Sequence, residues 1–131
     1  MNTDIIAECM SLSFANTPFP EIARKLAGAG VCSYTADLVQ LRKTYYGKGS
    51  ESADEPLPLT VGPGIAEAFD KDGVAASLRA IQQGQIGYAD FLRKIMAAGC
   101  ARYEVFIDGR KAVYFGRHGD FYIEPFPAQR N

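Results

Sequence analysis

A gap-free internal repeat limits what this chain can fold into. When residues 4–58 are placed over residues 73–127, each residue is compared with the one sixty-nine positions further along. Identical residues stand at eleven pairs: Ala7/Ala76, Arg24/Arg93, Lys25/Lys94, Ala29/Ala98, Gly30/Gly99, Tyr34/Tyr103, Tyr45/Tyr114, Gly47/Gly116, Glu55/Glu124, Pro56/Pro125 and Pro58/Pro127. Chance likeness between two amphipathic helices followed by strands would match apolar positions. Because glycines, prolines and a glutamate match as well, we favour two copies of one unit.

The repeat predicts an α+β fold made by tandem duplication of a helix-helix-antiparallel β-meander unit, with a period of sixty-nine positions. A unit of about sixty residues buries too little surface to be stable alone, so both copies should share one core. We therefore expect a single pseudo-twofold domain over residues 1–131. Its parts are repeat one at about 4–58, a packed connecting segment at about 59–72, and repeat two at about 73–127.

Apolar spacing and turn residues predict the elements of each copy. The first helices are expected over 4–14 and 74–83, the latter with Asp72 as its N-cap. A second helix begins near Pro20, and Gly30 and Gly99 supply the left-handed stops of the second helices. In the second copy, strands are expected over 103–107, 111–115 and 121–124.

The first copy should depart from the second in its hairpin. Asp108-Gly109 is a strong turn signal, whereas Val39-Gln40 stands in its place in the first copy. Since valine does not easily take a positive φ, the first hairpin is predicted to bend differently or to form one longer strand. The polar segment 50–55 predicts an exposed edge or an irregular loop, and the connecting segment is expected to contain a short helix after Pro63-Gly64.

Composition excludes several classes of function. The net charge of -1, with acids and bases interspersed, offers no basic surface for nucleic acid. The N-terminal residues have no basic stretch and the apolar runs are short, so we expect a cytoplasmic protein that does not contact a membrane. The three cysteines, Cys9, Cys32 and Cys100, have no metal-ligand spacing and are interpreted as buried thiols. Neither a dinucleotide nor a phosphate-binding glycine motif occurs, so no cofactor and no metal are predicted.

Three charged residues are candidates for catalysis. His118 is the single histidine and lies in a glycine-flanked turn; as a general base it would need Asp120 or Glu124 to orient it, and as a turn residue it would need nothing. Glu55 and Glu124 share a Glu-Pro-x-Pro context, so a pseudo-twofold could place them symmetrically for acid-base work or cation binding. Alternatively, each carboxylate binds nearby amides or a basic neighbour.

Repeated tyrosines are candidates for a ligand site or an interface. Rigid amphipathic rings give a large contact area at such surfaces. Adjacent residues of a strand point to opposite faces, so one of Tyr45 and Tyr46 should be in the core and the other exposed. The candidates are Tyr34, Tyr45, Tyr46, Tyr103 and Tyr114.

Three long runs extend over nearly the whole chain: FPEIARKLAGAGV, DLVQLRKTYYGKGSESADEPLPL and FLRKIMAAGCARYEVFIDGRKAVYFGRHGDFYIEPFP. They resemble the uncharacterised bacterial family that includes YbcV and YdfO. The resemblance implies an α+β fold and a bacterial, prophage-related origin, since several members lie in prophage regions and some are labelled phage envelope protein. It implies no site residues.

These observations leave three functional hypotheses. The leading one is a non-enzymatic cytoplasmic binding or protein-interaction module that forms a homodimer through sheet edges or exposed tyrosines. The first alternative is a small-ligand binder or enzyme with a cleft between the two repeats, using His118 and Glu124. The second alternative is a phage-related protein that contacts host or virion proteins.

Overall fold

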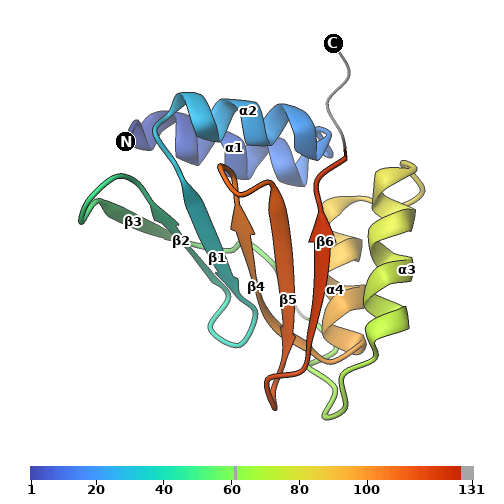
Figure 1. Cartoon of the computed structure of the whole chain (residues 1–131). Helices are drawn as coiled ribbons and strands as arrows, with labels where there is room; N and C mark the ends of the chain where they lie inside the picture. The colour runs from blue at the N-terminus through green and yellow to red at the C-terminus, as the bar shows by residue number, and fades with distance from the viewer. Residues whose placement is uncertain (61, 128–131) are drawn as a thin grey trace.

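The computed structural model describes residues 1–60 and 62–127 and has an α+β fold. Within this part of the chain, four helices and one six-stranded antiparallel sheet form the molecule (Figure 1). In chain order the elements are α1 (Thr3–Phe14), α2 (Phe19–Gly28), β1 (Ser33–Asp37), β2 (Arg42–Tyr46), β3 (Ser52–Pro56), α3 (Lys71–Gln82), α4 (Tyr88–Ala97), β4 (Cys100–Phe106), β5 (Lys111–Gly116) and β6 (Phe121–Pro125).

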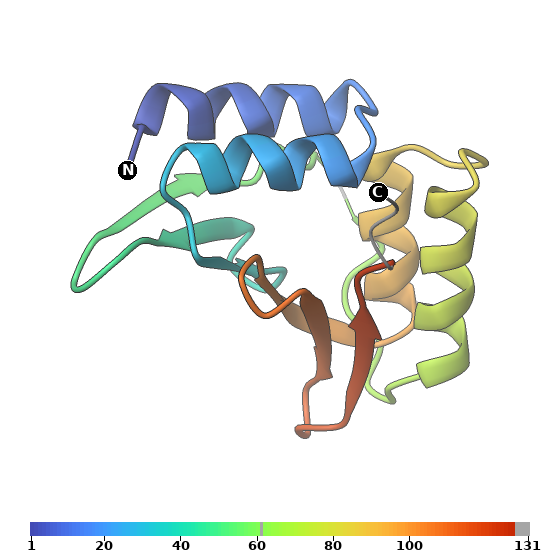
Figure 2. The ribbon, with the colours of Figure 1, turned by 45° about the horizontal axis from the view of Figure 1, so that its top comes forward.

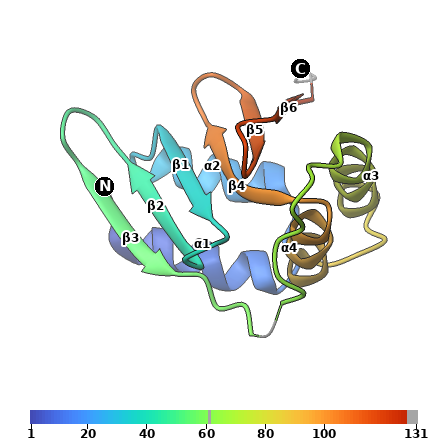
Figure 3. The same cartoon turned by 90° about the horizontal axis from the view of Figure 1, so that it is seen from below.

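The sheet has the strand order β3-β2-β1-β4-β5-β6, with β1 and β4 paired at its centre. In this central ladder Thr35 lies opposite Glu104, and Ser33 and Asp37 lie opposite Phe106 and Arg102. The two outermost strands, β3 and β6, are therefore at opposite edges, as the view from below shows (Figure 3). Among the strands of the described residues, β1 and β4 are the neighbours that do not follow each other in the chain.

Two helical pairs cover one face of the sheet. In Figure 2, α1 lies beside α2 across the top, and α3 lies beside α4 at the side of the strongly bent sheet. Alternating strand residues point toward these helices and are buried, including Ala36, Val105 and Ala112. The buried residues of both helical pairs and of the central strands belong to one hydrophobic cluster. Neither pair has a core of its own.

The starts of α1 and α3 are fixed by side-chain caps that satisfy open amides. Asn2 accepts hydrogen bonds from the amides of Asp4 and Ile5 at the start of α1. Asp70 accepts from the amide of Gly73 at the start of α3. The predicted cap Asp72 is therefore wrong: it lies inside the first turn of the helix, two residues after the true cap.

Both central hairpins turn in the same way, which contradicts the predicted difference between Val39-Gln40 and Asp108-Gly109. Each turn has four residues, 38–41 and 107–110, and the positive φ falls on the fourth, at Leu41 (56°) and Arg110 (55°). Val39 therefore does not need a left-handed backbone. Its amide and that of Gln40 donate to the Asp37 carboxylate, which holds the turn in place.

The segment between the two halves packs against α4 without forming a helix in its described residues, so the expected short helix is wrong. The amide of Ala66 donates to the Met96 carbonyl, and the amide of Asp70 donates to the Ala98 carbonyl. Its Ala68 carbonyl lies so close to Gly99 that a Cβ built there would be 2.1 Å from the oxygen. The segment is thus part of the folded body.

The polar segment before Leu57 forms β3, which is an exposed edge strand paired with β2. Of the two predicted alternatives, the exposed edge is confirmed. Within the described residues, no helix combines the length and apolar character needed to cross a lipid bilayer.

Candidate functional site

The structure contains a cleft of about 730 Å³ between the sheet and the helices. Its floor comes from the inward-facing residues of β1, β2, β4 and β5, and its walls come from the start of α2, the end of α3 and the loop before α4. Residues 124–127 close one side. A mostly apolar cleft of this size is typical of a small-molecule site.

Three buried tyrosines form the floor of the cleft. Tyr34, Tyr103 and Tyr114 point to the helix side because each occupies an inward position of its strand. The ring centroids of Tyr103 and Tyr114 are 5.1 Å apart, and those of Tyr34 and Tyr103 are 6.5 Å apart. Burial raises the pKa of all three well above its ordinary value, so the hydroxyls stay protonated.

Tyr88 joins the floor to the wall of the cleft. It begins α4, and its hydroxyl shares a hydrogen bond with the hydroxyl of Tyr103. Its ring packs edge-on against Phe14 of α1. The first turn of α4 is therefore held against both the sheet and the other helical pair.

Lys43 is the one buried cationic residue of the cleft. It lies on β2, is only 4% exposed, and places Nζ 5.2 Å from the centroid of Tyr34 and 4.8 Å from the centroid of Tyr88. Within residues 1–60 and 62–127, its ammonium makes no ion pair and no hydrogen bond. The two aromatic faces attract the ammonium. Glu55 is the residue opposite Lys43 in the β2–β3 register, but its carboxylate accepts the hydrogen bond of Tyr45 and forms no ion pair with Lys43.

Three polar groups of the cleft lining, one ammonium and two hydroxyls, are accessible from the cleft. The described structure has no sealed side-chain nitrogen or oxygen that lacks a hydrogen-bond partner. The Lys43 ammonium and the hydroxyls of Tyr34 and Tyr114 have no such partner within the described residues, so they must reach accessible space. Buried residues with unpaired polar ends facing a cleft are groups that a ligand can bind.

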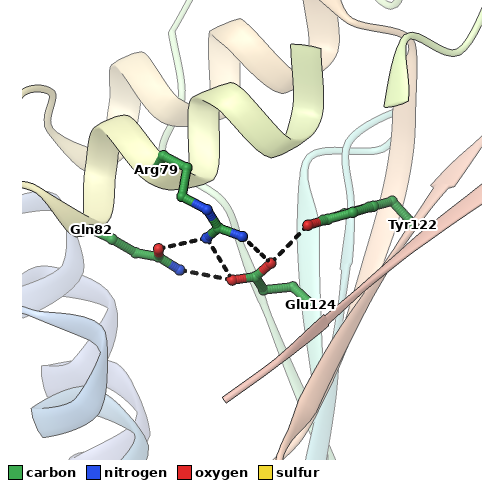
Figure 4. A network of polar contacts seen from close by, with 4 residues as sticks. All are labelled: Arg79, Gln82, Tyr122 and Glu124. Carbon is green, nitrogen blue, oxygen red and sulfur yellow. Dashed lines mark hydrogen bonds and ion pairs between the residues drawn. The ribbon is translucent and has the colours of Figure 1, made fainter. Parts of the chain in front are cut away.

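Glu124 stands at the other end of the cleft and is saturated by protein partners (Figure 4). Arg79 binds both carboxylate oxygens at 2.8 and 3.0 Å, Gln82 donates at 3.0 Å, and the Tyr122 hydroxyl donates at 2.9 Å. The hydrogen bonds from Arg79 contribute most to lowering the pKa of Glu124. The carboxylate is a fixed anion that ties α3 to β6.

The two repeated glutamates lie far apart rather than forming a carboxylate pair. Glu55 is on β3 and Glu124 is on β6, with the other four strands of the sheet between them. The Glu55 carboxylate accepts a hydrogen bond of 2.9 Å from the Tyr45 hydroxyl. Tyr45 is buried against Tyr34 but does not line the large cleft. No common acid-base or cation site is formed by the two glutamates.

His118 lies outside the cleft, in the turn between β5 and β6. Its Nε2 is 2.9 Å from the carboxylate of Glu67, and the two side chains are 66% and 80% exposed. Glu67, rather than Asp120 or Glu124, is thus its neighbour. The structure places His118 as an exposed turn residue with no contact to the tyrosine floor.

The remaining candidates divide between surface and core. Tyr46 is 42% exposed on the outer face of the sheet, opposite in direction to Tyr45. Cys9 and Cys100 are buried, and burial raises the pKa of the Cys100 thiol to about 12. Cys32 is half-buried. In the described part of the chain, no group of three or more His, Cys, Asp or Glu residues is placed to hold a metal ion.

Sequence reasoning missed Lys43, Tyr88 and Arg79. A usable signal existed for Lys43, because it alternates with Tyr45 along a strand and therefore shares the inward face of that tyrosine. A lysine at such a position contradicts the apolar pattern and marks a site. Arg79 and Tyr88 gave no such signal, since both lie among ordinary polar positions of helices.

These features define the class of the molecule, an α+β protein with one buried lysine in a tyrosine-lined cleft. The chain is 34% identical over 110 residues to the uncharacterized protein Rv2012 of Mycobacterium tuberculosis and equally to the uncharacterized protein Mb2035 of Mycobacterium bovis. The match covers 84% of this chain and 67% of each relative. The chain belongs to the family of these uncharacterized proteins. No protein-family model matches it.

Proposed function

We propose that this protein binds a small organic ligand in the tyrosine cleft. The observation that carries the proposal is the set of unpaired polar ends, on Lys43, Tyr34 and Tyr114, inside an otherwise apolar cleft of about 730 Å³. A protein interior normally pairs such groups, because leaving them unpaired costs stability. Their arrangement around accessible space is best explained by a ligand that supplies the missing partners.

The proposal is for binding without catalysis. Glu124 has its carboxylate occupied by Arg79, Gln82 and Tyr122, and His118 is outside the cleft. A general base needs to reach the proton that it takes, and neither residue meets that requirement at the tyrosine floor. Of the two functions in the first alternative, a small-ligand binder or an enzyme, we therefore propose the small-ligand binder.

The proposal includes the tandem duplication. The two second helices, α2 and α4, are separated by the repeat period of sixty-nine positions, and so are the two edge strands, β3 and β6. The left-handed glycines Gly30 (φ 89°) and Gly99 (φ 90°) have the same separation, as do the turn residues Leu41 and Arg110. Backbone features of this kind support one ancestral unit, because their positions depend on local geometry. On this proposal the cleft lies where the inner faces of both copies meet.

Origin and location remain part of the proposal. The resemblance to the YbcV/YdfO-like family, with its bacterial and prophage associations, and the cytoplasmic location stay predictions from the sequence. No described residue points specifically to contacts with host or virion proteins.

A single tryptophan can report on the cleft, because the chain has none of its own. Gln85→Trp places the reporter on the cleft wall at an exposed residue, whereas Gln83→Trp places it on the same loop outside the cleft lining. Titration with 4-biphenylbutanoate, 4-biphenylbutanamide and 4-biphenylbutylamine should give a saturable emission change in Gln85→Trp and none in Gln83→Trp. Absence of a saturable change with all three compounds would contradict the proposal.

A second candidate function, self-association, is favoured by an apolar patch on the outer face of β5 and β6. Val113 pairs with Ile123 and Phe115 pairs with Phe121, and Ile123 and Phe121 are 46% and 55% exposed. Exposed apolar groups of this kind are typical of protein contacts. Light scattering should detect a dimer of the unaltered chain and a monomer of Phe121→Ser. A monomer at all concentrations would remove this candidate.

A further inference from the structure

The charges around the cleft are unbalanced in favour of an anion. Among the described lining residues, three are charged: Lys43, Glu124 and Asp90. Glu124 is neutralised by Arg79, and Asp90 lies at an exposed rim position 3.5 Å from Arg93. Lys43 is therefore the buried charge that makes no ion pair within the described residues, since Glu55, opposite it on β3, is bonded to the Tyr45 hydroxyl instead.

A buried lysine without a carboxylate is costly to keep. The Lys43 ammonium reaches the cleft, but the residue is only 4% exposed, so most of its contact with water is lost, a cost that proteins normally offset with a paired charge. Here the offset within the described residues comes from the ring faces of Tyr34 and Tyr88. Such contacts recover only part of that cost. A negatively charged ligand would complete the compensation.

Differences between the two halves concentrate the free polar groups in the cleft. Residue 112, the repeat counterpart of Lys43, is alanine, so the ammonium occurs on one side alone. Tyr45 is hydrogen-bonded to Glu55, but its counterpart Tyr114 has no bond to Glu124, which binds Arg79, Gln82 and Tyr122 instead. The cleft thus has a cationic end at Lys43 and a neutral donor at Tyr114.

We infer that the ligand is an organic monocarboxylate with a flat apolar body, its carboxylate on the Lys43 ammonium and its body on the tyrosine floor. The inference rests on the proposed function and names its ligand class. One ammonium matches one negative charge, and the protonated hydroxyls of Tyr34 and Tyr114 donate to further ligand oxygen atoms. The stacked rings of Tyr103 and Tyr114 suit a planar body.

The three biphenyl compounds test this inference because they share one body and differ in the charge of the head group. Isothermal titration calorimetry on the full chain should give a dissociation constant for the carboxylate at least about tenfold lower than for the amide, since a charge-assisted contact is worth about 1.5–3 kcal/mol. The amine should bind most weakly. In Lys43→Met the carboxylate should bind no better than the amide, and Lys43→Arg should keep most of the preference.

Lys43→Met also separates a ligand role from a structural one. Methionine fills a similar volume without a charge, so the melting temperature should equal or exceed that of the unaltered chain. A marked fall in the melting temperature would show that Lys43 serves the fold and would overturn the inference, whatever the binding result. Lys43→Arg and the head-group comparison in the unaltered chain do not depend on that variant being folded.

The outcomes distinguish this inference from the proposal on which it rests. Equal affinity for carboxylate and amide would overturn the anion inference and leave cleft binding in place. If the amine bound most tightly, the tyrosine floor would be a site for a cation, and the anion inference would also be overturned. If none of the three compounds binds, both statements fail.

Discussion

At the scale of single residues, Glu124 and Asp54 offer a direct comparison of two carboxylates on opposite edge strands. Each pairs with an arginine, but the Glu124 side chain is 11% exposed whereas that of Asp54 is 55% exposed. Gln82 and Tyr122 add hydrogen bonds to Glu124. Ion pairs in water contribute little, and a shielded, multiply bonded carboxylate contributes more.

We expect Glu124→Gln to lower the free energy of unfolding by about 1–2 kcal/mol at pH 7, and Asp54→Asn by less than about 0.5 kcal/mol. The folded pKa of Glu124 is lowered, so its stabilising contribution is complete above the ordinary carboxylic pKa. It is lost as the pH falls through the folded pKa. Urea denaturation from pH 7 to pH 3 should therefore show the Glu124→Gln deficit shrinking in acid. Equal deficits in both variants, or one constant with pH, would refute this account.

Three of the tyrosines that line the cleft could be named from the sequence, but their polar neighbours could not. The comparison of residues 4–58 with residues 73–127 drew attention to Tyr34, Tyr103 and Tyr114, because a ring that recurs at the same spacing is conspicuous in the sequence. The partner of a carboxylate depends on which side chain reaches it in space. For this reason sequence order suggested Asp120 or Glu124 for His118, while the chain brings Glu67 to it across 51 residues.

At the scale of elements, Gly30 and Gly99 end α2 and α4 with nearly the same φ, 89° and 90°. Their surroundings differ, because a Cβ at Gly30 would have its nearest contact at 3.6 Å and one at Gly99 would be 2.1 Å from the Ala68 carbonyl oxygen. The backbone strain of an alanine is therefore equal at the two sites. An alanine at Gly99 would in addition clash with the Ala68 carbonyl oxygen, whereas an alanine at Gly30 would not clash.

Gly30→Ala should lower the free energy of unfolding by about 1 kcal/mol, which is the strain of a left-handed alanine. Gly99→Ala should lower it by about 3 kcal/mol or more, because the connecting segment has to move as well. Chemical denaturation of the two variants measures the difference. Similar losses at both positions would show that the packing of Ala68 on Gly99 has no energetic importance.

Element types were more predictable than the details of their ends. Helical periodicity and the glycine stops placed the four helices, since these signals are local. The dipeptide rule for hairpins misplaced the left-handed residue, because a four-residue turn puts it at Leu41 and Arg110 rather than at the second central position. Asp70 rather than Asp72 is the cap, because the connecting segment is hydrogen-bonded to the residues just after α4 as far as Asp70. That contact joins segments remote in sequence, so no local pattern indicates it.

At the scale of the whole molecule, the sequence predicted a shared core but not the arrangement that creates the cleft. The central β1 and β4 pairing joins strands from the two halves, and contacts remote in sequence of this kind are set by packing rather than by local pattern. The sheet bends between the two helical pairs (Figure 2), and the cleft is lined by residues of the sheet and of both pairs. Its cationic end could be recognised only after Lys43 was placed beside Tyr34 and Tyr88.

The register at the middle of the sheet also determines what each half would do if it were separated from the other. Thr35 and Glu104, which face each other there, are sixty-nine positions apart, the period of the proposed duplication, so an isolated half could meet a second molecule of the same half in the same alignment. Two first halves would place threonine against threonine, a compatible cross-strand pair. Two second halves would place glutamate against glutamate, and this repulsion favours the mixed pairing over self-pairing of the second half.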